Sequence, residues 1–340
     1  MSFAWEISTL HLCAASDAPA QSMVHPGGPA AAEIAWLWWI MLGTFTGVFI
    51  LVMVLLLYGI LRRSGAVAVF AIASETETGT IRNAGAAPPW GRTGFIVAGG
   101  VILPILVLTP LYVYSLTTSA RLRMPEDALT IRVVGHMWWW EVRYPESDVV
   151  SVNEIHIPAG KPVRLELTST DVIHSFWVPR LNGKRDMIPG IENVFWIQAD
   201  QSGVYRGQCG EYCGTQHANM AFEVIALQAA DFDAWLIAQK TIPPEPKSSI
   251  MEHGLRVFLT AGCVQCHSIQ GTRAAGNAGP DLTHLGSRRM IGGAMLPNTR
   301  GNLAGWIADP QAIKPGIKMP RSYLEADDLQ ALVSYLESLQ

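Results

Sequence analysis

Charged residues are scarce in this sequence. They make up 15% of its 340 residues, and the formal net charge is −4. No long run of Lys and Arg occurs, so the clustered positive charge that binds nucleic-acid phosphates is lacking, and we expect no nucleic-acid partner. Hydrophobic residues make up 49%, which is high for a soluble globular domain and indicates membrane segments.

Cysteine is scarce as well. The five cysteines are an isolated Cys13 and two close pairs, Cys209 with Cys213 and Cys263 with Cys266. Such pairs are more typical of metal or cofactor binding than of a disulfide framework. Residues 1–12 are too short and too interrupted for a secretory signal, and the small residues of a lipid attachment site are missing before Cys13. We therefore interpret Cys13 as incidental, or the start codon as misassigned.

Two long segments, 35–61 and 94–116, contain no charged residue at all. As helices they would span roughly 40 Å and 35 Å, against a hydrocarbon core of about 30 Å, so both can cross a membrane. Pro104 and Pro110 in the second segment are tolerated in membrane helices. The alternative is a pair of buried helices in a soluble protein.

Positive charge is also missing from the N-terminal tail, residues 1–34, which has no Lys or Arg. The loop between the two apolar segments, residues 62–93, carries four arginines: Arg62, Arg63, Arg82 and Arg92. Because positively charged loops stay on the cytoplasmic side, this loop is predicted to be cytoplasmic. Both ends of the chain, with everything after the second segment, are then expected on the outer face.

The pattern changes to short alternating strands over residues 128–226. Residues 163–168 alternate apolar and polar side chains, and residues 130–134, 194–198 and 221–225 are further predicted strands. Many short strands without long helices between them are typical of a β-sandwich or barrel of about 100 residues.

Soft metal ligands gather in this β region. Cys209, Cys213, His217 and Met220 lie within twelve residues, and His174 ends an earlier predicted strand. Thiolate, thioether and imidazole together favour copper, and two thiols on one loop are enough to bridge two copper ions. A Cys209–Cys213 disulfide and a structural zinc site are the alternatives; zinc leaves Met220 without a role.

Cys-x-Glu-x-Cys-x3-His-x2-Met, preceded by Asp-Val-x-His-Ser-Phe, resembles the CuA site of cytochrome c oxidase subunit II. That family has a two-helix hairpin followed by a cupredoxin-like domain, and the resemblance covers residues 34–236. It implies that Cys209 and Cys213 bridge a dicopper centre, CuA, completed by the side chains of His174, His217 and Met220. It further implies that Glu211 binds copper through its carbonyl and Mg²⁺ through its carboxylate, at the interface with the catalytic subunit.

Three consecutive tryptophans, in Gly135-His-Met-Trp138-Trp139-Trp140, resemble the aromatic segment near copper in that family. The resemblance implies that Trp138 is where electrons enter from cytochrome c, while Trp139 and Trp140 are expected to pack inside the sandwich. Quinol-oxidising relatives lack the copper ligands, so the donor is expected to be a cytochrome c or a cytochrome bc complex. One departure is the absence of an acid between Gly79 and Leu116, which puts a proton path through this subunit in doubt.

A second signature follows the Pro-rich stretch 241–249. Cys263-Val-Gln-Cys266-His267 is the pattern for covalent attachment of haem c, although zinc and redox sites also use it. The later Lys-Met319-Pro and the helical spacing around residues 328–339 resemble a class I cytochrome c, with Met319 as the second axial ligand rather than an ordinary core residue. His284 is interpreted as a surface or haem-propionate residue.

The expected fold class is a membrane α-helical hairpin, an all-β cupredoxin-like sandwich and an all-α class I cytochrome c domain. The expected parts are a periplasmic N-terminal tail (1–34), a two-helix transmembrane hairpin (35–116) with a cytoplasmic loop (62–93), a CuA domain (117–240), a linker (241–249) and a cytochrome c domain (250–340). The arrangement resembles the fused subunit of a caa-type oxidase in the bacterial inner membrane, partnered by catalytic subunit I and other oxidase subunits. A nitric or nitrous oxide reductase subunit and a copper-binding assembly factor are the alternative functions.

Overall fold

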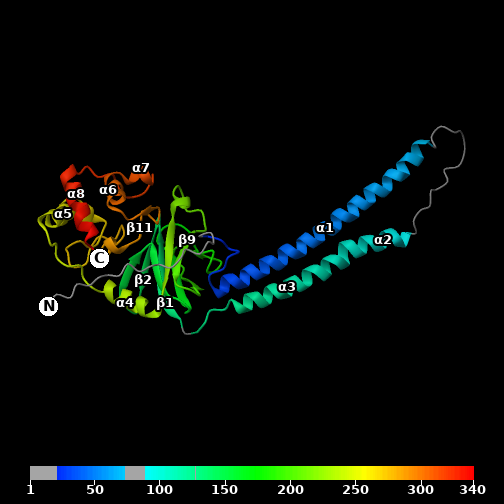
Figure 1. The fold of residues 1–340 in the computed structure, drawn as a ribbon, viewed down its shortest axis with the longest axis horizontal. Coiled ribbons are helices and arrows are strands. Elements are labelled where there is room, and N and C mark those ends of the chain that lie inside the picture. The colour runs from blue at the N-terminus through cyan, green and yellow to red at the C-terminus, as the bar shows by residue number, and fades with distance from the viewer. Residues whose placement is uncertain (1–20, 73–88, 127) are drawn as a thin grey trace. The chain divides into compact units, whose positions relative to one another are not determined.

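The computed structural model describes residues 21–72, 89–126 and 128–340 (Figure 1). Contacts between residues divide the chain into two compact units. One contains residues 33–123, and the other contains residues 124–340 together with the N-terminal residues up to 32. Cys13, the predicted incidental cysteine, lies outside the described residues.

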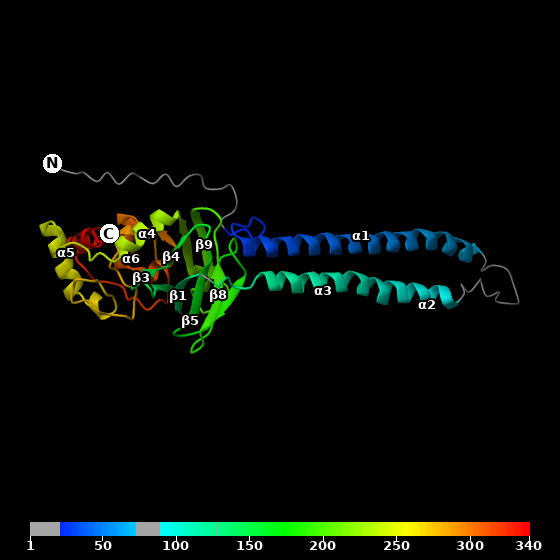
Figure 2. The ribbon, with the colours of Figure 1, turned by 90° about the horizontal axis from the view of Figure 1, so that it is seen from below.

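The smaller unit is helical. It contains most of α1 (Pro29–Ile72), then α2 (Pro89–Val97), a π-helical turn (Ala98–Ile102) and α3 (Leu103–Arg121). The stretches Pro29–Arg62 and Thr93–Arg121 are long and apolar enough to cross a membrane. α1 and α3 run side by side in both views (Figures 1 and 2), and Arg121 forms an ion pair with Glu33 at 3.3 Å. The two predicted apolar helices are confirmed.

The π-helical turn lies directly before Pro104, which occupies the first turn of α3. Proline lacks an amide hydrogen, and in a regular α-helix its ring collides with the carbonyl four residues earlier. A wider turn at this point removes that collision, and π turns commonly occur inside helices as such local adjustments. Pro110, in contrast, lies inside α3 without interrupting it.

The first domain of the larger unit consists of two five-stranded sheets. Their orders are β3-β2-β1-β5-β8 and β4-β10-β9-β6-β7. The strands are β1 (Leu129–His136), β2 (Trp139–Tyr144), β3 (Val149–Val152), β4 (Glu154–Pro158), β5 (Val163–Ser169), β6 (His174–Trp177), β7 (Lys184–Met187), β8 (Asn193–Ile197), β9 (Gly203–Cys209) and β10 (Ala221–Leu227), followed by α4 (Ala229–Gln239). All four predicted strands are present. Along β5 every second side chain is buried, because successive residues of a strand point to opposite faces.

An aromatic cluster fills the space between the sheets. The rings of Trp140 and Phe222 lie 5.0 Å apart, and those of Phe176 and Phe222 lie 4.7 Å apart, all fully buried. Gly207 on β9 makes room for this packing, since a Cβ there would lie 2.3 Å from the Phe222 ring. Burying rings of this size contributes most of the apolar area that holds a small sandwich together.

The second domain of the larger unit is helical. Its elements are α5 (Ser249–Thr260), β11 (Met290–Ile291), β12 (Leu296–Pro297), α6 (Arg300–Ala308), α7 (Pro310–Ile313) and α8 (Ala326–Glu337), with short 3-10 turns at Cys263–Gln265 and Leu285–Ser287. α5 begins at an N-cap, Ser248, whose side chain accepts from the amide of Met251. It crosses α8 at Gly254, where a Cβ would lie only 2.1 Å from the Ala331 carbonyl oxygen. The predicted C-terminal helix is confirmed.

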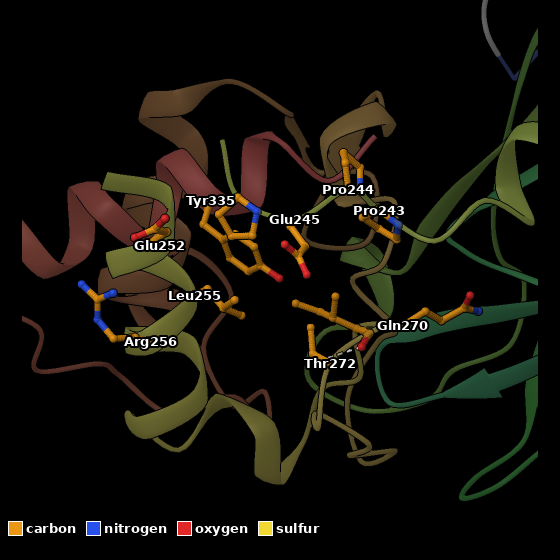
Figure 3. A pocket seen from close by; sticks show the side chains of 12 residues that line it. Pro243, Pro244, Glu245, Glu252, Leu255, Arg256, Gln270, Thr272 and Tyr335 are labelled. Atoms are coloured by element: carbon orange, nitrogen blue, oxygen red, sulfur yellow. Dashed lines mark hydrogen bonds between the residues drawn. The ribbon is translucent and has the colours of Figure 1, made fainter. Parts of the chain in front are cut away.

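The Pro-rich linker lies against this helical domain. Figure 3 shows Pro243 and Pro244 beside a cavity of about 410 Å³ that is also lined by Leu255 of α5 and Tyr335 of α8. None of the predicted haem ligands lines this cavity. Before the linker, the carbonyl of Gln239 is hydrogen-bonded to the buried ring of His284 at 3.0 Å. The linker is therefore anchored by contacts with the domain that follows it.

Polar contacts join the two domains of the larger unit. The carboxylate of Glu154 on β4 accepts a 2.7 Å hydrogen bond from the amide of Arg289, and the Arg289 guanidinium forms an ion pair with Glu223 at 3.1 Å. The Gln216 side chain donates to the Pro315 carbonyl at 2.7 Å. Glu154 is only 4% exposed, so this contact between the domains excludes water.

Candidate metal and haem centres

Strand pairing brings the two halves of the predicted copper site together. In the second sheet β6 pairs antiparallel with β9, with Phe176 opposite Cys209, so His174 at the start of β6 lies beside the end of β9. The chain then forms a loop, with a 3-10 turn at His217–Asn219, and returns as β10. A hydrogen bond from the Cys209 amide to the Met220 carbonyl, 2.9 Å long, closes this loop.

The predicted ligands form two groups, one around each thiol. Cys209 Sγ lies 3.8 Å from His174 Nδ1 and 3.1 Å from the Glu211 carbonyl oxygen. Cys213 Sγ lies 3.6 Å from His217 Nδ1 and 3.7 Å from Met220 Sδ. All six predicted ligands are thus brought together by the fold.

The two groups also meet each other. The ligand atoms of His174, Cys209 and Cys213 all lie within 4.8 Å of one another and are buried. Both cysteines are free thiols, so the disulfide alternative is not realised. Thiolates with imidazoles, a thioether and a carbonyl suit copper better than zinc, whose structural sites use four Cys or His ligands. In the described parts of the chain, no other cluster of three or more Cys, His, Asp or Glu is poised to hold a metal.

The two thiols compete for one proton. The hydrogen bond from Cys213, followed by that from His174, lowers the pKa of Cys209 to about 3 against the opposing effect of burial. The same contact with Cys209, together with burial, raises the pKa of Cys213. Two adjacent buried thiolates repel each other, whereas a bound metal ion deprotonates its thiol ligands outright. The pair therefore fits a cationic centre that neutralises both sulfurs.

Asp171 orients the first histidine of the site. Its carboxylate accepts from His174 Nε2 at 2.9 Å and from the amide of Met137 at 2.7 Å. Although burial acts in the opposite direction, these bonds lower the pKa of Asp171 to about 2. Holding the proton of His174 on Nε2 leaves Nδ1 free to face Cys209, as is usual for metal-binding histidines. Sequence reasoning assigned Asp171 no role, although an acid three residues before a ligand histidine could have indicated one.

The three tryptophans occupy different environments. Trp138 lies in the turn between β1 and β2, and its Nε1 donates to the Cys213 carbonyl at 2.9 Å. Trp140 is fully buried in the core, as predicted. The prediction of core packing is wrong for Trp139, whose ring instead stacks on His136 with centroids 4.2 Å apart. Trp139 begins β2, and because the next residue, Trp140, points into the core, Trp139 points to the opposite face of the strand.

Glu211 presents its carboxylate outward. One oxygen lies 3.7 Å from Lys184 Nζ, and the side chain is 46% exposed. A single exposed carboxylate beside a lysine is a weak site for Mg²⁺, which keeps octahedral oxygen coordination. The residues described around Glu211 therefore do not form a magnesium site by themselves.

In the helical domain, Cys263, Cys266 and His267 lie together in and after a 3-10 turn, and both cysteines are free. His267 Nδ1 is 2.8 Å from the Pro280 carbonyl oxygen. That contact places the proton on Nδ1 and leaves Nε2 free to bind iron. Gly279 lies close to the ring, since a Cβ there would be 2.9 Å from His267 Cε1. The geometry therefore fits covalent attachment of a haem with His267 as axial ligand.

Met319 is half-buried and does not belong to the apolar core of its domain. Its carbonyl and that of Ile317 both accept from the Gln311 amide, at 2.7 Å and 2.8 Å, so α7 fixes the loop that carries the thioether. This position favours the ligand role over that of a core residue. His284 is not a surface residue: it is 5% exposed, because its ring reaches inward to Gln239.

Two family models match the chain. Residues 149–229 match the periplasmic domain of cytochrome c oxidase subunit II, and residues 251–340 match cytochrome c. Cytochrome c oxidase subunit 2 of Alkalihalophilus pseudofirmus is 38% identical over 248 residues, covering 70% of this chain and 71% of that protein. This chain belongs to the cytochrome c oxidase subunit II family.

Other subunit II proteins are also similar to this chain. That of Bacillus subtilis is 31% identical, covering 71% of this chain and 72% of its own. The solved periplasmic domain of subunit II of cytochrome oxidase from Bradyrhizobium japonicum is 31% identical over 35% of this chain and 97% of its own, with a TM-score of 0.34. As a subunit II with a cytochrome c domain, the chain is part of an oxidoreductase complex and binds copper and haem.

Proposed function

We propose that this chain is the subunit at which electrons enter a haem-copper terminal oxidase. Electrons from an external donor reach a covalent c haem, pass to a dicopper CuA centre and leave for the catalytic subunit, which reduces oxygen to water and pumps protons. When bound, these groups supply the redox chemistry, and the residues of the chain hold and orient them.

The gathering of two imidazoles, a thioether and a backbone carbonyl around two buried thiols carries the proposal. Cys209 and Cys213 would bridge the two copper ions, with His174, His217 and Met220 as side-chain ligands and the Glu211 carbonyl completing the set. The pairwise distances of 3.1 to 3.8 Å among these atoms support the assignment. A preformed ligand set lowers the reorganisation needed when the centre changes oxidation state.

Cys263 and Cys266 would hold the haem through thioethers, and His267 and Met319 would be the ligands of its iron. The hydrogen bond of the His267 ring to the Pro280 carbonyl supports this by fixing the tautomer. His/Met ligation raises the haem potential, which suits a haem in a respiratory chain. Trp138, whose ring donates to the Cys213 carbonyl, is the proposed point where electrons enter the copper domain.

The two apolar helices are proposed to span the bacterial inner membrane, with the arginine-bearing loop 62–93 in the cytoplasm and the copper and haem domains on the periplasmic face. Catalytic subunit I and other oxidase subunits are the proposed partners, and a cytochrome c or a cytochrome bc complex is the donor. An Mg²⁺ ion at the contact with subunit I would use the outward carboxylate of Glu211 together with ligands from that partner.

Electron paramagnetic resonance and optical spectra of the purified oxidase complex containing this chain test the proposal. We expect a mixed-valence dicopper signal together with the spectrum of a low-spin c haem with His/Met ligation. Zinc, or a single copper ion, at the Cys209 and Cys213 site would contradict it. Turnover with oxygen, and none with nitric or nitrous oxide, separates the oxidase from the reductase alternative.

A further inference from the structure

Lys314 is the most deeply buried lysine of the described structure, although it lies at the boundary between two domains. It follows α7 in the haem domain, here residues 250–340, and is 2% exposed. A buried ammonium costs several kcal/mol of desolvation unless its surroundings compensate for it. The groups around the Lys314 ammonium therefore indicate why a charged side chain can be buried there.

The ammonium of Lys314 has three hydrogen-bond acceptors, all of them backbone carbonyls. It donates to Trp138 at 2.9 Å, to Asn219 at 2.8 Å and to Gly292 at 3.0 Å. An ammonium carries three protons and no acceptor, so every proton is used. A neutral amine has only two protons and would leave one carbonyl unpaired, so the arrangement matches the charged form.

The three carbonyls come from different parts of the fold. Trp138 belongs to the turn whose indole donates to Cys213, and Asn219 directly precedes Met220 in the copper loop. Gly292 belongs to the haem domain, after β11. One side chain thus joins the haem domain to both segments that surround the thiols.

Gly293 makes this approach possible. Its φ is +79°, a conformation that favours glycine, and a Cβ there would lie 2.7 Å from Lys314 Nζ and 3.2 Å from the Trp138 carbonyl oxygen. Its own carbonyl accepts from the amide of Ala221 in the copper domain at 3.2 Å. The backbone of the haem domain is therefore shaped to receive the ammonium and to contact the copper domain directly.

No carboxylate is among the hydrogen-bond partners of Lys314, so an ordinary ion pair does not account for this charge. Burial lowers the pKa of Lys314 to about 8, while the electrostatic effect of the nearby Cys213 acts in the opposite direction. The cation therefore lies in the electrostatic field of the thiol pair. A fixed positive charge there favours the more reduced state of a metal centre bound to those sulfurs.

We propose that Lys314 is a positioning residue that fastens the haem domain onto the copper-binding loop and, by its charge, raises the reduction potential of the centre held there. The statement about potential rests on the proposed function. The statement about fastening does not, because it concerns only contacts within the chain.

Hydrogen exchange of the full-length chain, purified in detergent with its bound cofactors, tests the fastening. Lys314→Met removes the charge while keeping an unbranched side chain, and Lys247→Met removes a charge from an exposed lysine as the control. We expect the Ala221 amide, whose acceptor is in the other domain, to exchange about tenfold faster in Lys314→Met, the effect of losing one hydrogen bond from a charged group. Lys314→Arg should restore most of the protection.

The second readout is the midpoint potential of the copper centre in the assembled oxidase. Lys314→Met should lower it, while Lys314→Arg and Lys247→Met should leave it near the wild-type value. Gly293→Ala disturbs the same junction without removing the charge, so it should speed Ala221 exchange even if Lys314→Met fails to fold.

If the Ala221 amide exchanges in both Lys314→Met and Gly293→Ala at the rate of the Lys247→Met control, the proposal that Lys314 fastens the two domains is wrong. A copper potential unchanged in Lys314→Met would overturn the electrostatic part. Absence of a dicopper signal from the wild-type complex would instead refute the proposed function, and the exchange result would still stand.

Discussion

Replacing Asp171 by Asn should weaken copper binding although Asp171 is not a copper ligand. One carboxylate oxygen accepts from His174 Nε2 at 2.9 Å and from the Val172 amide at 2.8 Å, and the other accepts from the Met137 amide at 2.7 Å. An Asn side chain has only one oxygen, so it cannot replace both acceptors.

Either orientation of the new amide is unfavourable. With its oxygen toward His174, its NH2 group faces the Met137 amide, and two donors meet at hydrogen-bond distance. With the amide turned over, its NH2 group requires an unprotonated His174 Nε2, which moves the ring proton to Nδ1. Nδ1 is the atom that lies 3.8 Å from Cys209 Sγ, so the proton then occupies the position needed for copper.

Losing a hydrogen bond of this charged kind costs about 1.5–3 kcal/mol, which corresponds to roughly 10- to 100-fold weaker metal affinity. Copper competition against a chelator of known affinity measures this on the full chain, with the dicopper resonance signal as a second readout. Asp186→Asn, at an exposed acid of the same domain, is the matched control. Affinity and spectrum within about twofold of the control would refute the argument that Asp171 fixes the tautomer.

Three further predictions concern the core of the site, the domain contact and the helix crossing. Met220→Leu keeps a fully buried side chain of similar volume, so the free energy of unfolding should fall by less than about 1.5 kcal/mol. The copper spectrum should nevertheless change and turnover should slow, and an unchanged copper signal would contradict the ligand role of Met220. Burial raises the pKa of Glu154 to about 7, so its contribution to stability is complete below the unfolded value of 4.5 and is lost as pH rises through about 7. Thermal unfolding between about pH 5 and pH 8 should show a loss of stability of up to about 3 kcal/mol, and Glu154→Gln should make stability less dependent on pH. An equally steep pH dependence in the variant would contradict the role assigned to Glu154. Gly254→Ala would place a Cβ 2.1 Å from a backbone oxygen of α8 and should lower the stability of the fold by at least about 1–3 kcal/mol, measured by circular dichroism. Gly301→Ala is the control: a Cβ there has nothing within 4 Å, so this change should be neutral or slightly stabilising. Equal melting temperatures of the two variants would contradict the steric argument.

The elements with a strong periodic signal were predictable from the sequence. The two apolar helices follow from their length and lack of charge. The alternation of β5 and the C-terminal helix follow from hydropathy, because burial on one face repeats with the period of the element. The π-helical turn before Pro104 was not predicted, since a proline in an apolar run indicates a disturbed helix without saying how the disturbance is accommodated. Trp139 was misplaced because adjacent residues of one strand point to opposite faces, so Trp139 and Trp140 cannot both pack in the same core.

The candidate ligands could be proposed from the sequence, whereas the residues that support them could not. Cysteine, histidine and methionine have few roles in such close spacing, so five candidate copper ligands could be proposed from one loop and one distant histidine, and the family resemblance added Glu211. Gln311 and Lys314 act through contacts with backbone carbonyls, and Asp171 contacts the amide of Met137 as well as the ring of His174. Their residue types are common on any surface, so apart from the spacing of Asp171 to His174 only the folded arrangement distinguishes them.

Hydrogen bonds and an ion pair join the haem and copper domains, and such polar contacts are consistent with the covalent link between them. Domain interfaces with so much polar character are typically weak between separate proteins. A linker as short as residues 241–249, itself packed on the haem domain, gives an effective concentration on the order of millimolar or more, so weak contacts suffice for constant docking. The interface can then fix the relative position of the two domains without providing high affinity. A buried Lys314 with three carbonyl partners suits this role, because its hydrogen bonds join segments of both domains. In the proposed relay, the external donor meets the haem domain on a different face, because this face is occupied by the chain's own copper loop.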